Sequence, residues 1–491
     1  ILSDSKQAKK RDVFRCYNRL MEQNTFRSVL TNGCRLDMTK PVLAGISGGP
    51  DSLCMLILLV EAGQSVIVAH LNHKLRPEAD DEAAKVEKFC AGRGITCVIE
   101  ERDVSIHART NKLSTEESAR MLRYQFLFEQ AALHNAQAVL VAHNADDQIE
   151  TVLMHLLRGS GSSGLKGMQM RSIQPQWSDT IPLVRPLLKT SRKEILDYCR
   201  EHDLSPVFDQ SNLDSKYFRN RIRQELLPEL TTYNPRIREL LLRTSEVIGS
   251  EDEYLNDQVE KAWKETLIRQ GKGFVVFSRP VMAALHPALG KRMLRRAIQL
   301  ADPGLRDIDF KALQRGFDFL EKDHQANHLS LLSEVEMIKN LRDQIIVCRK
   351  QDPLVDLWPR IEPGGPIPLK LQGITELGNG WQINSELVDG QRPIEKDEMT
   401  GTLDAAGITD LFVDTSKTGD VFLPFGLGGR KVKLGDYWTN KGLAERARIH
   451  WPLVRNQNQE ILWVAGFQIS EKFKVTTTTN RCLVMRLQRI D

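Results

Sequence analysis

The sequence predicts an α/β protein in which a doubly wound parallel sheet is followed by a helical region and a small mixed α/β C-terminal region. The chain has 491 residues, of which 41% are hydrophobic, so we expect roughly three or four domains. Short apolar runs alternate with helical patterns from Pro41 to about Leu204. Beyond residue 231 the pattern becomes helical, and beyond residue 329 it becomes rich in Gly, Pro and short alternating runs. These changes separate the predicted domains.

The first predicted domain, residues 39–230, follows a helical lead-in over residues 1–38. Its expected strands are Val42–Ile46, Ser65–Leu71, Thr96–Glu100 and Ala138–Ala142. The expected helices between them are Ser52–Ala62, Glu78–Gly92 and Thr115–Asn135. Strands that alternate with helices of this length form βαβ units and a parallel sheet. Ligands of such sheets bind at the carboxyl ends of the strands.

The rest of the chain divides into a helical domain (231–328), a β-rich or mixed module (329–420) and a compact C-terminal unit (421–491). From Gly426 to the end, basic residues far outnumber acidic ones, although the whole chain carries a net charge of only +4. Such an excess indicates a polyanionic partner or, alternatively, a solvated face.

Composition also indicates the cellular compartment of the protein. The eight cysteines include no C-x-x-C pair, so neither a structural zinc site nor a disulfide framework is expected. No signal peptide and no apolar run near 18 residues is visible, which predicts a cytoplasmic protein without a membrane span. The chain begins with Ile1 rather than Met, so we expect that its first residues are incomplete or processed, although the sequence does not determine which. An oligomer is possible, but the sequence does not determine the oligomeric state.

The loop Ser47–Ser52, with sequence SGGPDS, joins the first strand to the first helix. Gly48 and Gly49 permit positive φ and close approach of a ligand. Pro50 suits the first helical position. The free N–H groups of the helix start then form an anion site that suits phosphate, and the two serines add hydroxyl donors.

The loop contains no lysine, unlike the phosphate loop G-x-x-x-x-G-K-[ST]. Asp51 would repel phosphate unless a divalent cation joins the two, and Mg²⁺ accepts carboxylate and phosphate oxygens together. We therefore expect the six loop residues to bind ATP and Asp51 to bind Mg²⁺. The alternative is a tight turn in which Asp51 only complements the helix dipole.

A second acidic site follows the fourth expected strand, in NADDQIET. Asp147 and Glu150 stand three residues apart on one helix face and repel each other unless a cation lies between them. A lysine ammonium or Mg²⁺ would serve. Asp146 is expected to be a helix-dipole charge only. His143, at the strand end, is a candidate for nucleotide contact or proton transfer.

These motifs together resemble the tRNA(Ile)-lysidine synthetases, a family within the N-type ATP pyrophosphatases. The loop SGGPDS resembles the pyrophosphate loop of that superfamily. The other motifs in register are HLNHKLR, STEESARMLRY, AHNADDQIET and DQSNLDSKYFRNRIRQELLP, and the resemblance resumes at the C-terminus with LPFGLGGRKVKLGDYW and ILWVAGFQISEKFKVTTTT. The resemblance covers roughly Val42 to Pro228 and then the tail.

The resemblance implies a carbon–nitrogen ligase. ATP activates the 2-carbonyl of the wobble cytidine in tRNA(Ile) with a CAU anticodon, and the ε-amine of free L-lysine then attacks. The products are lysidine, AMP and pyrophosphate. Catalytic roles are implied for Asp51, His143, Asp147 and Glu150, and lysine binding for Asp147 and Glu150.

We also expect a set of basic side chains to contact the tRNA. Guanidinium forks suit phosphate and base recognition. The predicted residues are Arg120, Arg123, Arg185, Arg192, Arg219, Arg223, Arg430, Lys431 and Lys433. Trp451 and Trp463 could stack on RNA bases, although buried core positions are more common for tryptophan.

Two questions stay open at this level. The attacking amine has an ordinary pKa of about 10.4 and must lose a proton, and Asp147, Glu150 and His143 are all candidates for the base. Other functions are a tRNA cytidine thiolase, of which many carry C-x-x-C pairs, or a non-catalytic RNA-binding relative. The missing C-x-x-C pair disfavours the first, and the intact loop with the two acids disfavours the second.

Overall fold

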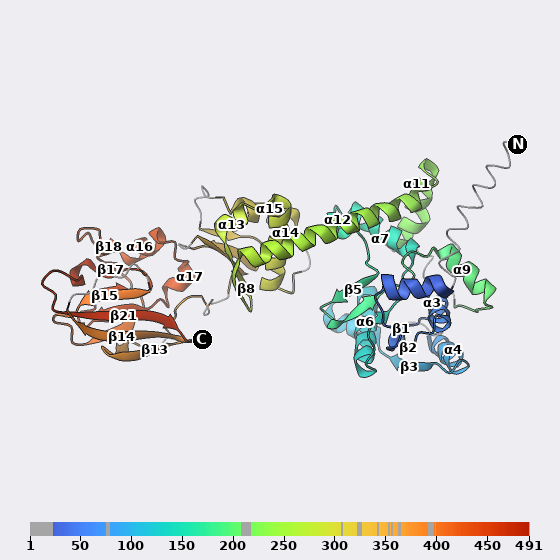
Figure 1. Cartoon of the computed structure of the whole chain (residues 1–491), viewed down its shortest axis with the longest axis horizontal. Coiled ribbons are helices and arrows are strands. Elements are labelled where there is room, and N and C mark those ends of the chain that lie inside the picture. The colour runs from blue at the N-terminus through green and yellow to red at the C-terminus, as the bar shows by residue number, and fades with distance from the viewer. Residues whose placement is uncertain are drawn as a thin grey trace. The chain divides into compact units, whose positions relative to one another are not determined.

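The computed structural model describes residues 23–74, 79–207, 218–305, 308–321, 327–340, 343–351, 354, 357–361, 365–390, 397 and 399–490 (Figure 1). The chain forms two compact units, Ile1–Tyr254 and Leu255–Asp491. The division falls within the long helix α12 (Ile237–Thr266).

A six-stranded sheet is the centre of the first unit, with strand order β3-β2-β1-β4-β6-β5. Its strands are β1 (Val42–Gly45), β2 (Val66–Asn72), β3 (Thr96–Glu101), β4 (Val139–Leu140), β5 (Arg171–Gln174) and β6 (Ser178–Val184). The first four and β6 run parallel, whereas the edge strand β5 is antiparallel to β6. The predicted parallel sheet is confirmed, and the hairpin β5–β6 is an addition that the sequence analysis did not include.

Helices cover both faces of this sheet because side chains alternate along β1. Val42 and Ala44 pack with α3 (Pro50–Glu61), α4 (Ala79–Ala91) and α9 (Arg192–Glu201). Leu43 points to the other face and packs with α6 (Thr115–Leu133). The successive β1 residues therefore serve two cores, which is the doubly wound arrangement expected for this pattern.

The remaining helices of the first unit surround the carboxyl ends of the strands or lead into α12. They are α2 (Gln23–Ser28), the π-helical turn η2 (Val29–Gly33), α5 (Val104–Asn111), α7 (Ala145–Leu157), α8 (Ser162–Leu165), α10 (Phe218–Arg221), the π-helical turn η4 (Ile222–Leu226) and α11 (Leu227–Tyr233). Helix α7 begins directly after β4, and α3 begins directly after β1. Because β1 and β4 are neighbours, the two helix starts lie at one edge of the sheet.

The second unit begins with an antiparallel five-stranded sheet of order β7-β8-β11-β10-β9. Its strands are β7 (Leu267–Gly271), β8 (Phe274–Ser278), β9 (His328–Ser330), β10 (Val335–Lys339) and β11 (Gln344–Arg349). The helices α13 (Arg279–Ala283), α14 (Pro287–Ala301) and α15 (Phe310–Asp318) lie between β8 and β9 in the chain. The segment 231–328, predicted to be helical, also contains the hairpin of β7 and β8, and β8 pairs with β11 beyond residue 328.

The C-terminal part contains two four-stranded sheets, β12-β16-β19-β20 and β13-β14-β21-β15. Their strands are β12 (Ile367–Leu369), β13 (Gly373–Gly378), β14 (Trp381–Asp389), β15 (Thr400–Asp404), β16 (Leu411–Asp414), β19 (Leu453–Asn456), β20 (Ile461–Val464) and β21 (Arg481–Arg489). The smaller elements are β17 (Val421–Phe422), β18 (Val432–Lys433), α16 (Leu434–Asn440), α17 (Glu445–Arg448) and η5 (Glu471–Phe473). Trp451 is 6% exposed and Trp463 is 0% exposed, so both tryptophans are core residues.

The mixed C-terminal region is confirmed, while the domain limits at residues 38, 230, 328 and 420 stay predictions. Residues 1–22 of the helical lead-in lie outside the described residues, and α2 and η2 provide helix over part of the remainder. Among the helices of the described ranges, none has the length and apolar character needed to cross a membrane.

Candidate active site

The loop Ser47–Ser52 forms a tight turn at the start of α3. Gly48 has φ +82°, and a Cβ at this position would lie 3.3 Å from Val86 Cγ2. A side chain is therefore disfavoured at Gly48 both by the backbone conformation and by the space available. Pro50 occupies the first turn of α3, as predicted, and Gly49 caps the helix without a side-chain hydrogen bond.

Hydroxyl groups hold the loop from within. Ser52 is 5% exposed and donates from Oγ to the Gly49 carbonyl at 2.9 Å. The Ser47 N–H donates to Ser52 Oγ at 3.3 Å. The first-turn amides of α3 have no acceptor within the helix, so the loop presents donors and a partial positive charge to an anion.

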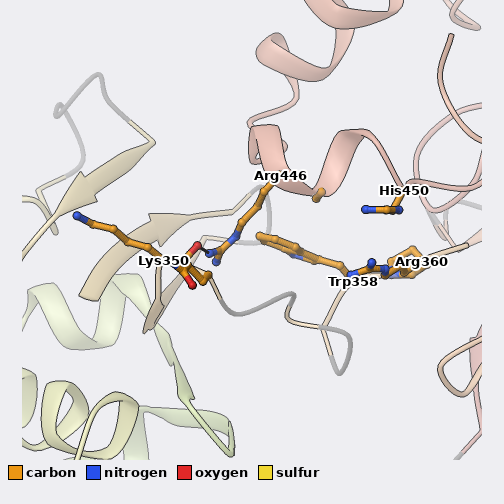
Figure 2. A pocket seen from close by; sticks show the side chains of 8 residues that line it. Lys350, Trp358, Arg360, Arg446 and His450 are labelled. Atoms are coloured by element: carbon orange, nitrogen blue, oxygen red, sulfur yellow. Dashed lines mark hydrogen bonds between the residues drawn. The ribbon is translucent and has the colours of Figure 1, made fainter. Parts of the chain in front are cut away.

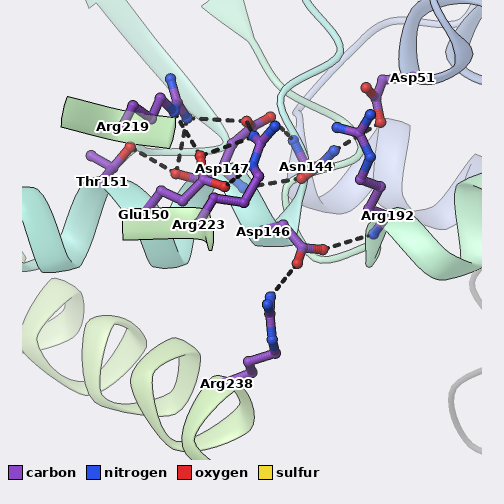
Figure 3. Close-up of polar contacts among 10 residues, drawn as sticks. All are labelled: Asp51, Asn144, Asp146, Asp147, Glu150, Thr151, Arg192, Arg219, Arg223 and Arg238. Atoms are coloured by element: carbon purple, nitrogen blue, oxygen red, sulfur yellow. Dashed lines mark hydrogen bonds and ion pairs between the residues drawn. The ribbon is translucent and has the colours of Figure 1, made fainter. Parts of the chain in front are cut away.

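Asn144 joins this loop to the second acidic site (Figure 3). Its Nδ2 donates to Asp51 Oδ1 at 2.8 Å, across 93 residues of sequence. Asn144 also caps α7, since its Oδ1 accepts from the Asp147 N–H at 3.0 Å and its own N–H donates to Asp147 Oδ2 at 3.0 Å. One amide side chain therefore fixes the relative positions of Asp51 and Asp147.

Asp147 and Glu150 project from α7 onto the same two arginines. Arg219 Nε donates to Glu150 Oε2 at 2.7 Å, and its Nη2 donates to Asp147 Oδ1 at 3.0 Å. Arg223 Nε donates to Glu150 Oε1 at 2.6 Å. The predicted lysine-binding acids and two of the predicted tRNA-binding arginines thus form one group, which we call the acid–arginine cluster.

Burial in the acid–arginine cluster is uneven. The Glu150 side chain is 1% exposed, whereas the side chains of Arg219 and Arg223 are 35% and 26% exposed. A buried carboxylate is stable only with positive partners. The spacing of the two acids predicted a positive charge between them. In the structure, the guanidinium groups of Arg219 and Arg223 supply that charge.

The charges of the site shift the pKa of Asp147. Burial raises it, Arg219 and the Asn144 N–H lower it, and the neighbouring carboxylates of Glu150 and Asp51 raise it further, with a net upward direction. Arg223 shows the complementary behaviour: burial lowers its pKa, but Glu150, Asp147 and Asp146 raise it, and the net pKa lies above the ordinary value. Both shifts show that Asp51, Asp147 and Glu150 form one electrostatic group.

His143 lies at the carboxyl end of β4, in positively charged surroundings. Its pKa is well below the usual value, first because of burial and then because of Arg185, Arg123, Arg219 and Arg120. Its Nδ1 is buried and, among the described residues, has no hydrogen-bond partner. The lowered pKa keeps the His143 imidazole neutral at pH 7.

The arginines around His143 differ in accessibility. Arg120 and Arg123 are exposed on α6, with their guanidinium carbons 5.0 Å and 5.6 Å from the centre of the Tyr124 ring. Arg185 is 6% exposed and donates from Nη1 to the Gln169 carbonyl at 2.8 Å. Because Arg185 is buried, surface exposure gives no support to its predicted contact with tRNA. Its positive charge contributes to the lowered pKa of His143.

Asp146 has a larger role than the predicted helix-dipole charge. Its Oδ2 accepts from the Arg192 N–H at 2.8 Å, and its Oδ1 pairs with Arg238 of α12. The Arg192 side chain points toward Asp51 in Figure 3. The first turn of α7 is thus tied to the starts of α9 and α12.

The Gly-Ser segment that precedes β5 is also fixed to these helices. Gln148 of α7 donates to the Lys166 carbonyl at 3.1 Å and accepts from the Met168 N–H at 2.7 Å. Asp252 of α12 is 0% exposed and pairs with Lys166 Nζ at 2.8 Å, while Ser163 Oγ donates to it at 3.0 Å. This segment contains the short helix α8 (Ser162–Leu165).

The remaining predicted RNA-binding residues belong to the second unit. Arg430, Lys431 and Lys433 are exposed near β18. Their contact with tRNA stays a prediction.

Sequence reasoning missed Asn144, Gln148, Asp252 and the partnership of Arg219 and Arg223 with the acids. For Asn144 a signal was present, since Asn three residues before Asp147 is a typical helix cap. For Asp252 no local pattern exists, because its partners are 86 to 90 residues away.

The donor set at Asp51 can be compared with the needs of Mg²⁺. Within the described ranges, no group of three His, Cys, Asp or Glu side chains is arranged to hold a metal ion. Mg²⁺ commonly binds through one or two carboxylates and the phosphates of a substrate. The carboxylate of Asp51 lies beside an anion-binding helix start, so it fits a Mg²⁺ ion held by one carboxylate and the phosphates of a substrate.

The first unit thus has the strand–loop–helix site of an ATP pyrophosphatase, and comparison with known proteins agrees: the PP-loop domain family matches residues 20–230. The TilS substrate C-terminal domain family matches residues 411–487. A tRNA(Ile)-lysidine synthase from Dehalococcoides mccartyi is 34% identical over 457 residues, which cover 90% of this chain and 94% of the relative. The chain belongs to the tRNA(Ile)-lysidine synthase family.

Other matches extend over similar lengths. A tRNA(Ile)-lysidine synthase from Geobacter sulfurreducens is 30% identical over 91% of this chain and 93% of its own length. Among solved structures, the U34-tRNA thiolase NcsA from Methanococcus maripaludis with its [4Fe-4S] cluster has a TM-score of 0.39 and 18% identity, over 48% of this chain and 80% of its own. A likeness at this level says nothing about the reaction.

Proposed function

We propose that this chain uses ATP to ligate free L-lysine to the 2-position of the wobble cytidine of tRNA(Ile) with a CAU anticodon, and that the site described above performs both steps. Family membership supports ATP-dependent lysidine formation on tRNA(Ile). The observation that carries the assignment of the site is the hydrogen-bonded line from Asp51 through Asn144 to Asp147 and on to Glu150. This line of contacts supports an anion site beside a cation site.

In the first step, the loop Ser47–Ser52 binds the triphosphate through the α3 amides and the hydroxyls of Ser47 and Ser52. Mg²⁺ bound at Asp51 would neutralise phosphate charge and favour departure of pyrophosphate. Arg120 and Arg123, exposed on α6, bind the phosphates that flank the wobble cytidine. The imidazole of His143 is neutral and lies at the carboxyl end of β4, where it would contact the cytidine or the adenylate.

In the second step, the lysine substrate enters the acid–arginine cluster as a cation. Its ε-ammonium resembles the guanidinium groups in charge, so it can replace Arg219, the more exposed of the two. The released Arg219, with Arg223 and Arg192, then becomes available to tRNA phosphates. This exchange explains why Arg219 and Arg223, which were predicted to bind tRNA, pair with the acids that we propose to bind lysine.

The lysine amine must lose a proton before it attacks. The pKa of Asp147 is raised by burial and by its acidic neighbours, which makes its carboxylate a better proton acceptor than an ordinary aspartate. Burial, and then the surrounding arginines, depress the pKa of His143, which makes it a weaker base than an ordinary histidine. We therefore assign the proton transfer to Asp147 and lysine binding mainly to Glu150. The reaction would take place in the cytosol, where tRNA and ATP are available.

The direct test is incorporation of labelled lysine into a tRNA(Ile) transcript with a CAU anticodon. The wild-type chain should incorporate lysine only when ATP is present, and AMP and pyrophosphate should form in equal amounts. Asp51→Ala should lose pyrophosphate release while it retains tRNA binding. Asp179→Ala, at an exposed carboxylate of β6, is the matched control and should remain active. A folded wild-type chain that never incorporates lysine would refute the proposal.

A further inference from the structure

A cavity in the second unit lies between the end of β11, the segment around Trp358 and helix α17 (Figure 2). Its volume is about 220 Å³, and it is lined by Lys350, Gln351, Trp358, Pro359, Arg360, Arg446, Ala447 and His450. This is smaller than the roughly 300–1,000 Å³ of typical small-molecule sites. The size suits one planar ring system rather than a whole cofactor.

The lining is cationic and aromatic. None of the eight lining residues, all within the described ranges, is acidic. Figure 2 shows the Trp358 indole between the guanidinium groups of Arg446 and Arg360, with the His450 imidazole on the same side of the cavity, while the Lys350 side chain points away. Arg446 lies 5.4 Å from the centre of the Trp358 ring, within range of a cation–π contact.

Arg446 is fixed in place by its other partners, so it forms a rigid wall. Its Nη1 pairs with Glu336 Oε1 at 2.7 Å and donates to the Arg349 carbonyl at 3.1 Å. Glu336 belongs to β10 and is 6% exposed. The cavity wall is therefore anchored to the five-stranded sheet, and its shape does not depend on a free arginine side chain.

Aromatic rings and arginine planes beside positive charge are the typical surface for single-stranded nucleic acid. We infer that this cavity binds one unstacked nucleotide of the RNA substrate, with the base against Trp358 and Arg446 and the neighbouring phosphate at Arg360 and His450. The inference rests on the proposed function, because that function supplies an RNA as the partner of the chain.

The test compares tRNA affinity among variants of the full chain. Trp358→Ala and Arg360→Ala should each weaken binding of the tRNA(Ile) transcript about tenfold, the usual effect of removing one stacked base or phosphate contact. Trp358→Phe keeps an aromatic face and should lose about twofold. Lys311→Ala, an exposed lysine of α15 outside the cavity, should bind as wild type. At saturating tRNA, the rate of lysine incorporation should be unchanged in Lys311→Ala.

A second arm identifies the nucleotide. Transcripts with one abasic position each should include a position whose loss weakens binding to wild type but not further to Trp358→Ala. Unchanged affinity in Trp358→Ala and Arg360→Ala, both folded, would overturn the inference, as would tight binding of free CMP or AMP that does not compete with tRNA. If the cavity variants weaken tRNA binding although wild type forms no lysidine, the cavity assignment stands and the proposed function fails.

Discussion

The acid–arginine cluster of the first unit and the Arg455–Asp420 pair of the second unit both join charged side chains from distant segments, yet their burial is reversed. In the cluster the acid is enclosed and the cations reach solvent. In the pair the cation is enclosed: the Arg455 side chain is 1% exposed and also donates to the Gln459 and Thr415 carbonyls at 3.0 and 3.1 Å.

The difference separates exchangeable counter-ions from structural ones. A cation that faces solvent can leave and regain its hydration, so a substrate cation can take its place at the buried acid. A buried cation held by fixed carbonyls cannot leave without a large desolvation cost. Of the two, only the first arrangement suits a binding site, and the following experiments can break or sharpen that distinction.

The largest expected effect is on catalysis. Glu150→Gln removes the buried negative charge that receives the lysine cation, and lysine incorporation should fall about a hundredfold or more. The midpoint of thermal unfolding should change little, because the two arginines can turn to solvent. Incorporation assays and a melting curve check both halves. A large loss of stability with normal activity of the folded fraction would show that the cluster is structural.

The next effect is on stability. Asp420→Asn leaves Arg455 buried without a negative partner, and it should lower the free energy of unfolding of the second unit by about 3 kcal/mol. Denaturant titration of the full chain, with probes in each unit, measures this. ATP binding by the first unit should persist. A variant as stable as wild type would remove the contrast between the two charge groups.

A smaller effect concerns exchange itself. Arg219→Ala frees part of the acid–arginine cluster, so the KM for lysine should fall by about two- to fivefold, the usual range for a partly exposed ion pair. Arg221→Ala is the matched control, because Arg221 pairs with Glu225 in solvent. If Arg219→Ala instead raises the KM for lysine, Arg219 assists lysine binding and does not compete with it.

The smallest effect depends on pH. The folded-state pKa of His143 lies below its ordinary value, so the unfolded chain binds more protons in the window below about pH 6.5. The stability that comes from neutral His143 is thus present above that pH and is lost as pH falls. His143→Gln should reduce the drop in melting temperature between pH 7.5 and 5.5 by on the order of 2 °C. An identical drop in both proteins would contradict the placement of His143 among the arginines.

Local sequence was enough for the elements that carry the chemistry. The strand–SGGPDS–helix turn, the N-terminal position of Pro50 and the shared helix face of Asp147 and Glu150 follow from residue conformations and helical spacing within a few residues. The helix start at Ser191 is equally local, since Ser191 and Glu194, three residues apart, exchange the reciprocal bonds of a capping box.

The errors and omissions share a different physical origin. The region from residue 231 was read as helical, but β7 and β8 form a hairpin within it, and β8 pairs with β11, beyond residue 340. The pairing of β8 with β11 joins residues far apart in sequence, which local periodicity does not report.

The sequence by itself thus determined a phosphate-binding turn, two neighbouring acids and a supply of arginines, because short-range backbone geometry encodes them. Only the tertiary structure decided which arginines meet which acids. The distances in sequence are 69 and 72 residues for Arg219 with Glu150 and Asp147, 73 for Arg223 with Glu150, and 93 for Asn144 with Asp51. Such pairings depend on the packing of whole helices around the sheet. An unpaired buried carboxylate would cost a large free energy, so the burial of Glu150 requires that a positive side chain lie beside it.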